Sequence, residues 1–377
     1  MNRKSRVRCP TCSNEFSGAM EFCPVCVLRT GLASELESGE SVSQDAVKPT
    51  SEHRTQRFEH YELIRGDDGH PIELGRGAMG VTYRAIDVAL GCPVALKVVN
   101  ERYLSDESAR LRFLREARAA ASVRHPNVAS VFHLGRNGRN YFYAMEFVEG
   151  EPLDKLIERS GRLEVRLALE IARQVAAGLA AVHKQKLVHR DIKPSNIMVN
   201  LEEAGAATAK IIDLGLAKAV QGAGSQPAIS MVGVFVGTPE FASPEQFSGV
   251  PVDIRSDLYS LGATLWQMLA GHAPFRGTPG EVMYQHLHTP LTMGQLGQVP
   301  QPAMLLLEVL LEKNPALRFQ NPAEMLTALA AVRGAIDGGH IITRQSLLQI
   351  PPVDSSGVTW KPPTPRGRRK SPWPDCP

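Results

Sequence analysis

One polar loop near the middle of the chain constrains the fold more than any other stretch of sequence. It reads V-H-R-D-I-K-P-S-N, and the segment I-I-D-L-G follows it closely. Asp191 can accept a proton from a hydroxyl group, and Lys193 can neutralise a phosphoryl group during transfer. Asn196 and Asp213 offer the hard oxygen ligands that Mg²⁺ prefers. The two segments together indicate phosphoryl-transfer chemistry.

A glycine-rich segment and a lysine precede this loop. Gly75, Gly77 and Gly80 form G-x-G-x-x-G, after which V-T-Y continues as a strand, whereas a dinucleotide-binding fold opens a helix there. The pattern therefore favours a hairpin that closes over phosphates. Lys97 follows in the apolar strand V-A-L-K, and Glu116 on the next helix is its expected partner, because a buried lysine needs one. Taken alone, this segment also allows an edge-strand lysine directed to water.

The order of apolar patterns predicts an α+β architecture. A small β-rich lobe comes first, and the pattern turns helical beyond Asp154. A helix capped by Ser105 or Asp106 interrupts the sheet, and D-G at positions 68 and 69 marks a tight turn. The expected strands are 61–64, 71–74, 80–86 and 93–99.

With these motifs in this order, the central block resembles a protein kinase of the Hanks (eukaryotic-like) type. The run L-G-R-G-A-M-G-V and the H-P-N-V segment at 125–128 resemble the bacterial Ser/Thr kinases in particular. The resemblance implies a bilobal kinase fold, ATP with Mg²⁺ or Mn²⁺, and protein Ser/Thr hydroxyls as substrates. It implies that Asp191 is the catalytic base and that Lys193 meets the γ-phosphate. Asn196 and Asp213 would be the metal ligands.

The same resemblance implies a nucleotide site between the lobes. The three glycines would cover the phosphates, and Lys97, anchored by Glu116, would hold the α- and β-phosphates. The backbone of Glu146 and Val148, beside the gatekeeper Met145, would bond the adenine edge. The residues expected to enclose the adenine ring are Leu74, Ala95 and Met198.

Further motif residues support the kinase interpretation. The resemblance implies that Glu245 pairs with Arg318 and that Asp257 braces the loop carrying Asp191. The chain departs from the family pattern at three places without removing a group that performs chemistry: Leu214 replaces the usual Phe, Ser243 replaces Ala, and Thr82 replaces Val.

Control by phosphorylation is a further expectation. Arg190, beside Asp191, is a cation that can grip a phosphate on the loop between Asp213 and Glu245. Ser225 and Ser230 are the hydroxyls in the middle of that loop, and we expect autophosphorylation there. The alternative is that residues 221–230 form only a mobile connection.

Four cysteines near the N-terminus predict a structural metal site. They form the pairs Cys9-x-x-Cys12 and Cys23-x-x-Cys26, the spacing of a zinc ribbon. Because four thiolates fill a tetrahedral site, the zinc would be structural. Two local disulfides or a rubredoxin-like iron site are the alternatives.

Composition sets the boundaries and limits the partners. We expect a zinc-ribbon-like module at 1–29, a flexible linker at 30–59, a kinase domain at 60–335 with lobes 60–147 and 148–335, and a Pro-rich, basic, disordered tail at 336–377. The net charge of +3 provides no reason to expect nucleic acid. The sequence predicts neither a membrane span nor a secretory signal, so we expect a cytoplasmic protein.

Two other functions remain open on the sequence alone. The chain could be a pseudokinase scaffold that binds nucleotide and signals through its zinc ribbon. Alternatively, the ribbon could be the main element, an adaptor for nucleic acid or protein that the kinase domain regulates. The partner of the ribbon cannot be identified from its sequence pattern.

Overall fold

The computed structural model describes residues 56–348 and the backbone of 6–8 and 15–17; the gaps within 56–348 are 78–79, 101–103, 105, 139, 203–205 and 216–237. The chain divides into two compact units, Met1–Arg54 and Thr55–Pro377. In the first, β1 (Arg6–Arg8) pairs antiparallel with β2 (Glu15–Ser17). The predicted zinc ligands Cys9, Cys12, Cys23 and Cys26 lie outside the described residues, as do Ser225 and Ser230.

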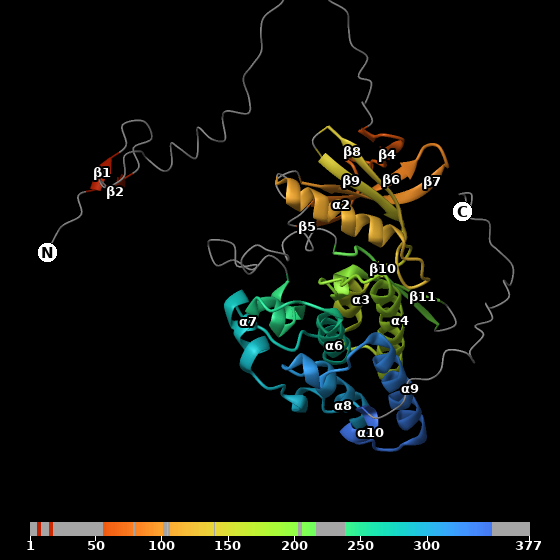
Figure 1. Cartoon of the computed structure of the whole chain (residues 1–377), viewed down its shortest axis with the longest axis vertical. Coiled ribbons are helices and arrows are strands. Elements are labelled where there is room, and N and C mark those ends of the chain that lie inside the picture. Colours follow the sequence, from red (N-terminus) through yellow and green to blue (C-terminus); the bar gives the residue numbers. More distant parts are fainter. Residues whose placement is uncertain are drawn as a thin grey trace, which may run out of the picture. The chain divides into compact units, whose positions relative to one another are not determined.

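The second unit begins with an antiparallel sheet in the order β3-β4-β6-β7-β9-β8, with β5 pairing on β6 (Figure 1). Its strands are β3 (Arg57–Phe58), β4 (Tyr61–Leu63), β5 (Glu73–Gly77), β6 (Gly80–Asp87), β7 (Cys92–Val99), β8 (Val131–Asn137) and β9 (Asn140–Glu146). One face buries a small core that includes Phe58, Leu96 and Phe142. The sheet therefore starts at β3, inside the segment 30–59 that the sequence assigned to a linker, because Phe58 supplies an aromatic ring to this core.

Two short strands share one side of β6. Both β4 and β5 pair with it, and the chain between them leaves the sheet as a hairpin closed by the bridge of Arg65 to Pro71. Gly69 has φ +77° at the tip, and the His70 N–H donates to Asp68 Oδ1 at 3.0 Å. The predicted D-G turn is therefore present.

The predicted helix beside the sheet is α2 (Glu107–Ala121), and Asp106 is its N-cap, accepting from the Ala109 N–H at 3.1 Å. Phe113, Ala117 and Ala120 are buried on the face that joins the larger core. The polar and charged residues of α2 are exposed or partly exposed.

The helical lobe follows, and Figure 1 shows it below the sheet. Its core is built around α4 (Val165–Lys184) and α6 (Ile254–Ala270), and 14 of the 17 residues of α6 are buried. Short strands β10 (Glu151–Pro152), β11 (Ile197–Leu201) and β12 (Ala207–Ile211) form a second sheet beside it. The helices are α3 (Leu153–Ser160), α4 (Val165–Lys184), α5 (Pro244–Ser248), α6 (Ile254–Ala270), α7 (Pro279–His288), α8 (Gln301–Leu310), α9 (Pro322–Gly338) and α10 (Arg344–Leu348).

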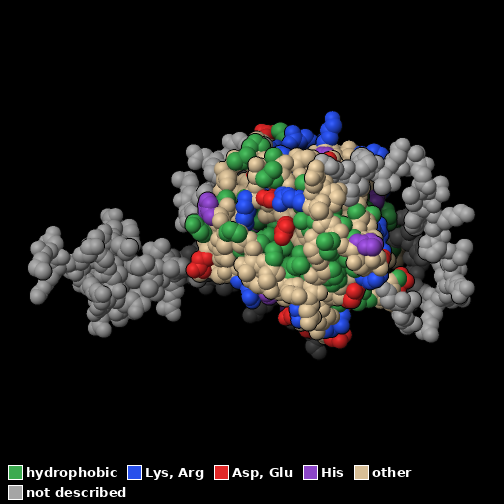
Figure 2. Space-filling model, turned by 90° about the horizontal axis from the view of Figure 1, so that it is seen from below, with side chains coloured by type: hydrophobic (Ala, Val, Ile, Leu, Met, Phe, Trp, Pro, Cys, Tyr) green, Lys and Arg blue, Asp and Glu red, His purple; other side chains and the backbone are tan. Residues whose placement is uncertain are grey.

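The predicted α+β architecture is confirmed, with one difference at its end. Helix α9 continues to Gly338 and α10 follows, although the sequence assigned 336–377 to a disordered tail. Leu347, at 2% exposure, anchors α10 on the helical lobe. Seen from below, the described surface carries acidic, basic and hydrophobic side chains interspersed rather than one basic stripe (Figure 2). None of the described helices has the length and apolar character needed to cross a bilayer.

Candidate active site

The loop carrying Asp191 is held from beneath by Asp257 of α6. Asp257 is fully buried and accepts the backbone N–H groups of His189 and Arg190, both at 2.7 Å. Burial raises the pKa of the Asp257 carboxyl to about 7, while the two amide hydrogen bonds act in the opposite direction. Arg190 has φ +64°, a left-handed conformation that is unfavourable for a side chain of this size. The predicted brace by Asp257 is therefore formed, and it stabilises a strained turn.

The polar residues of this loop converge. Asn196 Nδ2 donates to the backbone oxygen of Asp191 at 2.8 Å and to its Oδ2 at 3.0 Å. Lys193 Nζ lies 3.2 Å from Asp191 Oδ2 and donates to Thr238 Oγ1 at 3.1 Å. The carboxylate is thus fixed between an amide and an ammonium group, beside a threonine from a distant segment.

The hairpin of β11 and β12 brings Asp213 to the same end of the sheet as Asn196. Ile197 pairs with Ile211, and the Ile212 N–H donates to the Asn196 oxygen at 2.9 Å. Asp213 itself has φ +61°. These strand pairings place the two predicted metal ligands on neighbouring strand ends.

Asp213 is joined to the β-rich lobe through both carboxylate oxygens. Tyr143 Oη donates to Oδ1 at 2.7 Å, and Lys97 Nζ forms an ion pair with Oδ2. Burial alone would raise the pKa of Asp213, but the Lys97 charge and these hydrogen bonds outweigh it and hold the pKa at about 2. Burial, followed by the Asp213 charge, raises the pKa of Tyr143. Asp213 is therefore a carboxylate at neutral pH.

The predicted partner of Lys97 differs from the observed one. Among the described residues, no ion pair joins Lys97 to Glu116; Lys97 pairs with Asp213, and Glu116 Oε1 lies 3.5 Å from Arg115. The prediction assumed that the face of α2 that carries Glu116 is directed toward Lys97. That face depends on how α2 is rotated against the sheet, which local sequence does not determine.

The predicted nucleotide-binding residues lie on strands of the β-rich lobe, in the connection after β9 and on β11 of the helical lobe. Gly75 and Gly77 are exposed on β5, and Gly80 passes so close to β7 that a Cβ would lie 1.9 Å from the Val98 oxygen. Ala95 on β7 pairs with Met145 on β9, and both are buried. The remaining predicted residues are Leu74 on β5, Glu146 at the end of β9, Val148 in the following connection and Met198 on β11.

Three contacts across the lobes were not predicted. Tyr143 binds Asp213, Lys210 forms an ion pair with Glu146, and Asn127 Nδ2 donates to the Ala209 oxygen at 2.8 Å. A tyrosine within the apolar strand Y-F-Y-A-M was the one available signal, since a buried hydroxyl needs a partner.

The predicted pair of Glu245 and Arg318 is formed in the helical lobe. Arg318 Nη1 and Nη2 donate to Glu245 Oε1 and Oε2 at 2.7 and 3.0 Å. Both side chains are buried, and although burial acts to raise the pKa of Glu245, the Arg318 guanidinium lowers it overall. This bidentate pair ties α5 to the segment before α9.

Comparisons with known proteins agree with this geometry. Residues 71–328 match the model of the protein kinase domain family. Serine/threonine-protein kinase PknB of Mycolicibacterium smegmatis is 34% identical over 84% of this chain and 50% of its own length. PknA of Mycobacterium tuberculosis is 36% identical over 69% of this chain and 60% of its own length. The kinase domain of M. tuberculosis PknI superposes with a TM-score of 0.56 at 25% identity, over 74% of this chain and 98% of that chain. The chain thus spans half to three fifths of the length of the two sequence relatives.

Proposed function

Because this chain belongs to the protein kinase family, we propose that it is a serine/threonine kinase that transfers the γ-phosphate of Mg-ATP to protein hydroxyl groups. One observation carries the proposal: Asp191, Lys193, Asn196 and Thr238 form one hydrogen-bonded cluster. Phosphoryl transfer needs a base for the hydroxyl proton and cations for the phosphate charge, held in fixed positions. The cluster supplies both.

Each group of the cluster has one role in this proposal. The Asp191 carboxylate orients the attacking hydroxyl and accepts its proton. Lys193, fixed by Asp191 and Thr238, neutralises the oxygens of the phosphoryl group. The lysine two residues after the base supports a Ser/Thr substrate, because tyrosine-directed members of the family have a different arrangement there.

The donor set fits a hard divalent cation. Asn196 uses Nδ2 for both of its side-chain bonds to Asp191, and its Oδ1 takes part in no hydrogen bond among the described residues. Asp213, with a pKa of about 2, supplies a charged oxygen. When bound, Mg²⁺ would supply charge neutralisation for the phosphate oxygens. Asn196 and Asp213 would hold it.

We propose that Lys97 exchanges partners when nucleotide binds. Lys97 neutralises Asp213 in this conformation, and its ammonium group would turn to the α- and β-phosphates of a bound nucleotide. We propose that Glu116 then accepts the ammonium group, after α2 moves toward β7. The present contact would be the resting arrangement.

The experiment is transfer of labelled γ-phosphate from Mg-ATP to the chain and to a generic Ser/Thr substrate. Asp191→Asn keeps an oxygen for Asn196 Nδ2 but removes the base, and we expect transfer to fall at least ~10³-fold. Asp337→Asn, at an exposed ion pair, is the matched control and retains activity. A folded wild-type chain that binds ATP but transfers no phosphate would instead support the scaffold function.

We also propose autophosphorylation on Ser225 or Ser230. The support is Arg190, whose backbone is fixed by Asp257 beside the base and whose side chain carries a permanent charge. Phosphosite mapping after incubation with Mg-ATP tests this. Phosphate on neither serine would contradict it.

The N-terminal unit, we propose, holds a structural zinc ion through Cys9, Cys12, Cys23 and Cys26. The support is their spacing, together with the pairing of β1 and β2, whose connecting sequence contains the first Cys pair. Cys9→Ser with Cys12→Ser should remove one equivalent of zinc; unchanged zinc content would exclude the site. The cytoplasm, which provides ATP and reduced thiols, is the compartment that we propose.

A further inference from the structure

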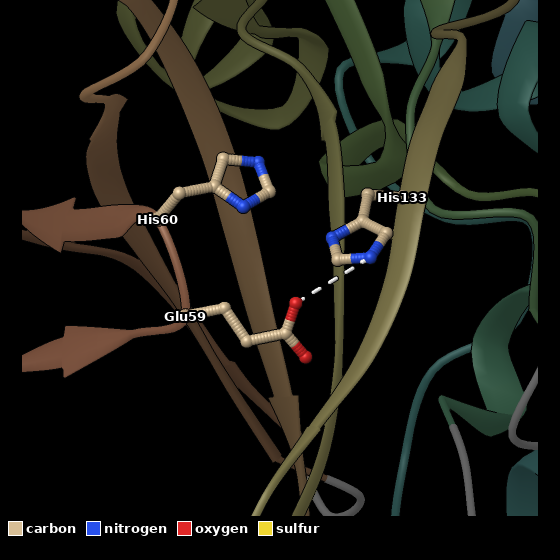
Figure 3. A group of neighbouring side chains, drawn as sticks. All are labelled: Glu59, His60 and His133. Carbon is tan, nitrogen blue, oxygen red and sulfur yellow. Dashed lines mark ion pairs between the residues drawn. The ribbon is translucent and has the colours of Figure 1, made fainter.

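A second group of metal-ligating side chains lies in the β-rich lobe, in the turn between β3 and β4 and on β8. Glu59, His60 and His133 each offer one ligand atom, and these atoms all lie within 4.8 Å of one another. Figure 3 shows the three side chains pointing toward one another, Glu59 and His60 from one turn and His133 from a separate strand.

The cluster lies where the two edges of the sheet meet. Strands β3 and β8 stand at opposite ends of the strand order, yet Asn137 Nδ2 of β8 donates to the Arg57 oxygen of β3 at 2.9 Å. The Arg136 N–H likewise donates to Glu59 Oε1 at 3.3 Å. The sheet is therefore curled until its first and last strands touch. The three side chains bridge the contact between the β3 end and the β8 end of the sheet.

Backbone irregularities direct the ligands to one point. Glu59 has φ +54° in the two-residue turn between β3 and β4, a conformation that costs free energy for a non-glycine residue. A β-bulge between Val131 and His133 changes the direction in which the His133 side chain leaves the strand. Its Nε2 lies 3.6 Å from Glu59 Oε2, and its Nδ1 is buried with no hydrogen-bond partner among the described residues. A buried imidazole nitrogen without a partner requires an explanation.

A fixed carboxylate stands behind His60. Asp87 is 6% exposed, and its Oδ1 accepts the N–H groups of Ala89 and Leu90, both at 3.0 Å. Its Oδ2 lies 3.5 Å from His60 Nε2. A carboxylate bonded to one ring nitrogen orients the other nitrogen toward a metal, which is the usual surrounding of a metal-binding histidine. The Nδ1 of His60 is thereby left for the cation.

We propose that Glu59, His60 and His133 bind a divalent transition-metal ion of the Zn²⁺ type. Two imidazoles and one carboxylate match the ligand preference of that ion rather than of Mg²⁺. Ligands of a tetrahedral zinc ion lie about 3.3 Å apart, given Zn–N distances of ~2.0 Å. The side chains of Glu59, His60 and His133 are 40%, 42% and 34% exposed, so they can move the remaining distance. The bound ion would link the turn between β3 and β4 to strand β8.

The test is the zinc content of the 377-residue chain after equilibrium dialysis against Zn²⁺. We expect His133→Gln to hold one equivalent less than the wild type, and His183→Gln, at an exposed position on α4, to hold the same amount. The N-terminal cysteines are identical in all three chains, so the difference counts this site alone. Equal zinc content in wild type and His133→Gln would overturn the proposal.

Two further variants keep the result independent of any misfolding of His133→Gln. Glu59→Gln retains an oxygen for the Arg136 N–H but loses the anionic ligand, so we expect it to lose the same equivalent. Asp87→Asn keeps an acceptor for the turn amides and should weaken Zn²⁺ binding about 10- to 100-fold. Wild-type affinity in both variants, measured by calorimetric titration with Zn²⁺, would contradict the site.

Discussion

Asp213 has both carboxylate oxygens engaged in this conformation. Tyr143 donates to one, and Lys97 lies against the other. A cation that enters the active site must therefore compete with the tyrosine hydroxyl for the carboxylate. Each such hydrogen bond to a charged group contributes about 1.5–3 kcal/mol, and part of that is lost when the metal binds.

Tyr143→Phe should lower the Mg²⁺ concentration that gives half-maximal phosphate transfer, by about 3- to 10-fold, because Asp213 no longer has to release the hydroxyl. Tyr141→Phe, on the same strand, is the matched control and should leave the requirement unchanged. The measurement is a Mg²⁺ titration of transfer at saturating ATP. An increased Mg²⁺ requirement in Tyr143→Phe would show that the hydroxyl helps to position Asp213 for the metal.

At the scale of elements, α7 is attached to the helical lobe through a buried histidine. His286 Nδ1 lies 2.8 Å from Tyr259 Oη of α6, and its Nε2 lies 3.1 Å from the Glu240 oxygen. Burial, and then the nearby Lys313 charge, lower the pKa of His286 to about 3. The folded chain therefore keeps this ring neutral at a pH where the unfolded chain, with an ordinary histidine pKa of about 6.5, is protonated.

This difference predicts acid sensitivity. Because the unfolded state binds the extra proton, the stability contributed by His286 is present above pH ~6.5 and is lost as the pH falls toward 3. By pH 5 the loss is about 2 kcal/mol. Urea unfolding at pH 7 and pH 5 should show a smaller pH dependence for His286→Gln than for the wild type. His183→Gln, at an exposed site, should behave as the wild type does.

The ion pair of Arg318 and Glu245 gives a second prediction at this scale. Arg318→Met leaves a buried carboxylate without its partner, and we expect the free energy of unfolding to fall by about 3–5 kcal/mol. Arg333→Met removes an exposed pair with Glu170, 2.8 Å apart, and should cost less than ~1 kcal/mol. Denaturant unfolding of the two variants checks the contrast. Similar losses in both would mean that the buried pair adds nothing beyond a surface contact.

At the scale of the whole molecule, the sequence predicts lobe order and the loop cluster well, because the residues of Asp191 to Asn196 are neighbours in the chain. Prediction from the sequence fails where a contact depends on how elements distant in the chain pack against one another. The partner of Lys97 depends on the orientation of α2, and the meeting of β3 with β8 depends on how far the sheet curls. Neither leaves a local pattern, so Glu59 and His133 could not be linked in advance.

The start of the second unit can be tested by two truncations. A chain beginning at residue 55 retains β3, whereas one beginning at residue 61 loses Phe58, which is 5% exposed and packs edge-on against Phe142 with ring centroids 5.5 Å apart. Loss of a buried Phe side chain costs about 3–5 kcal/mol. We therefore expect the first truncation to match the full chain in thermal unfolding with EDTA present, and the second to unfold several degrees lower. Equal unfolding temperatures for the two truncations would mean that the lobe begins at β4 and that β3 is dispensable.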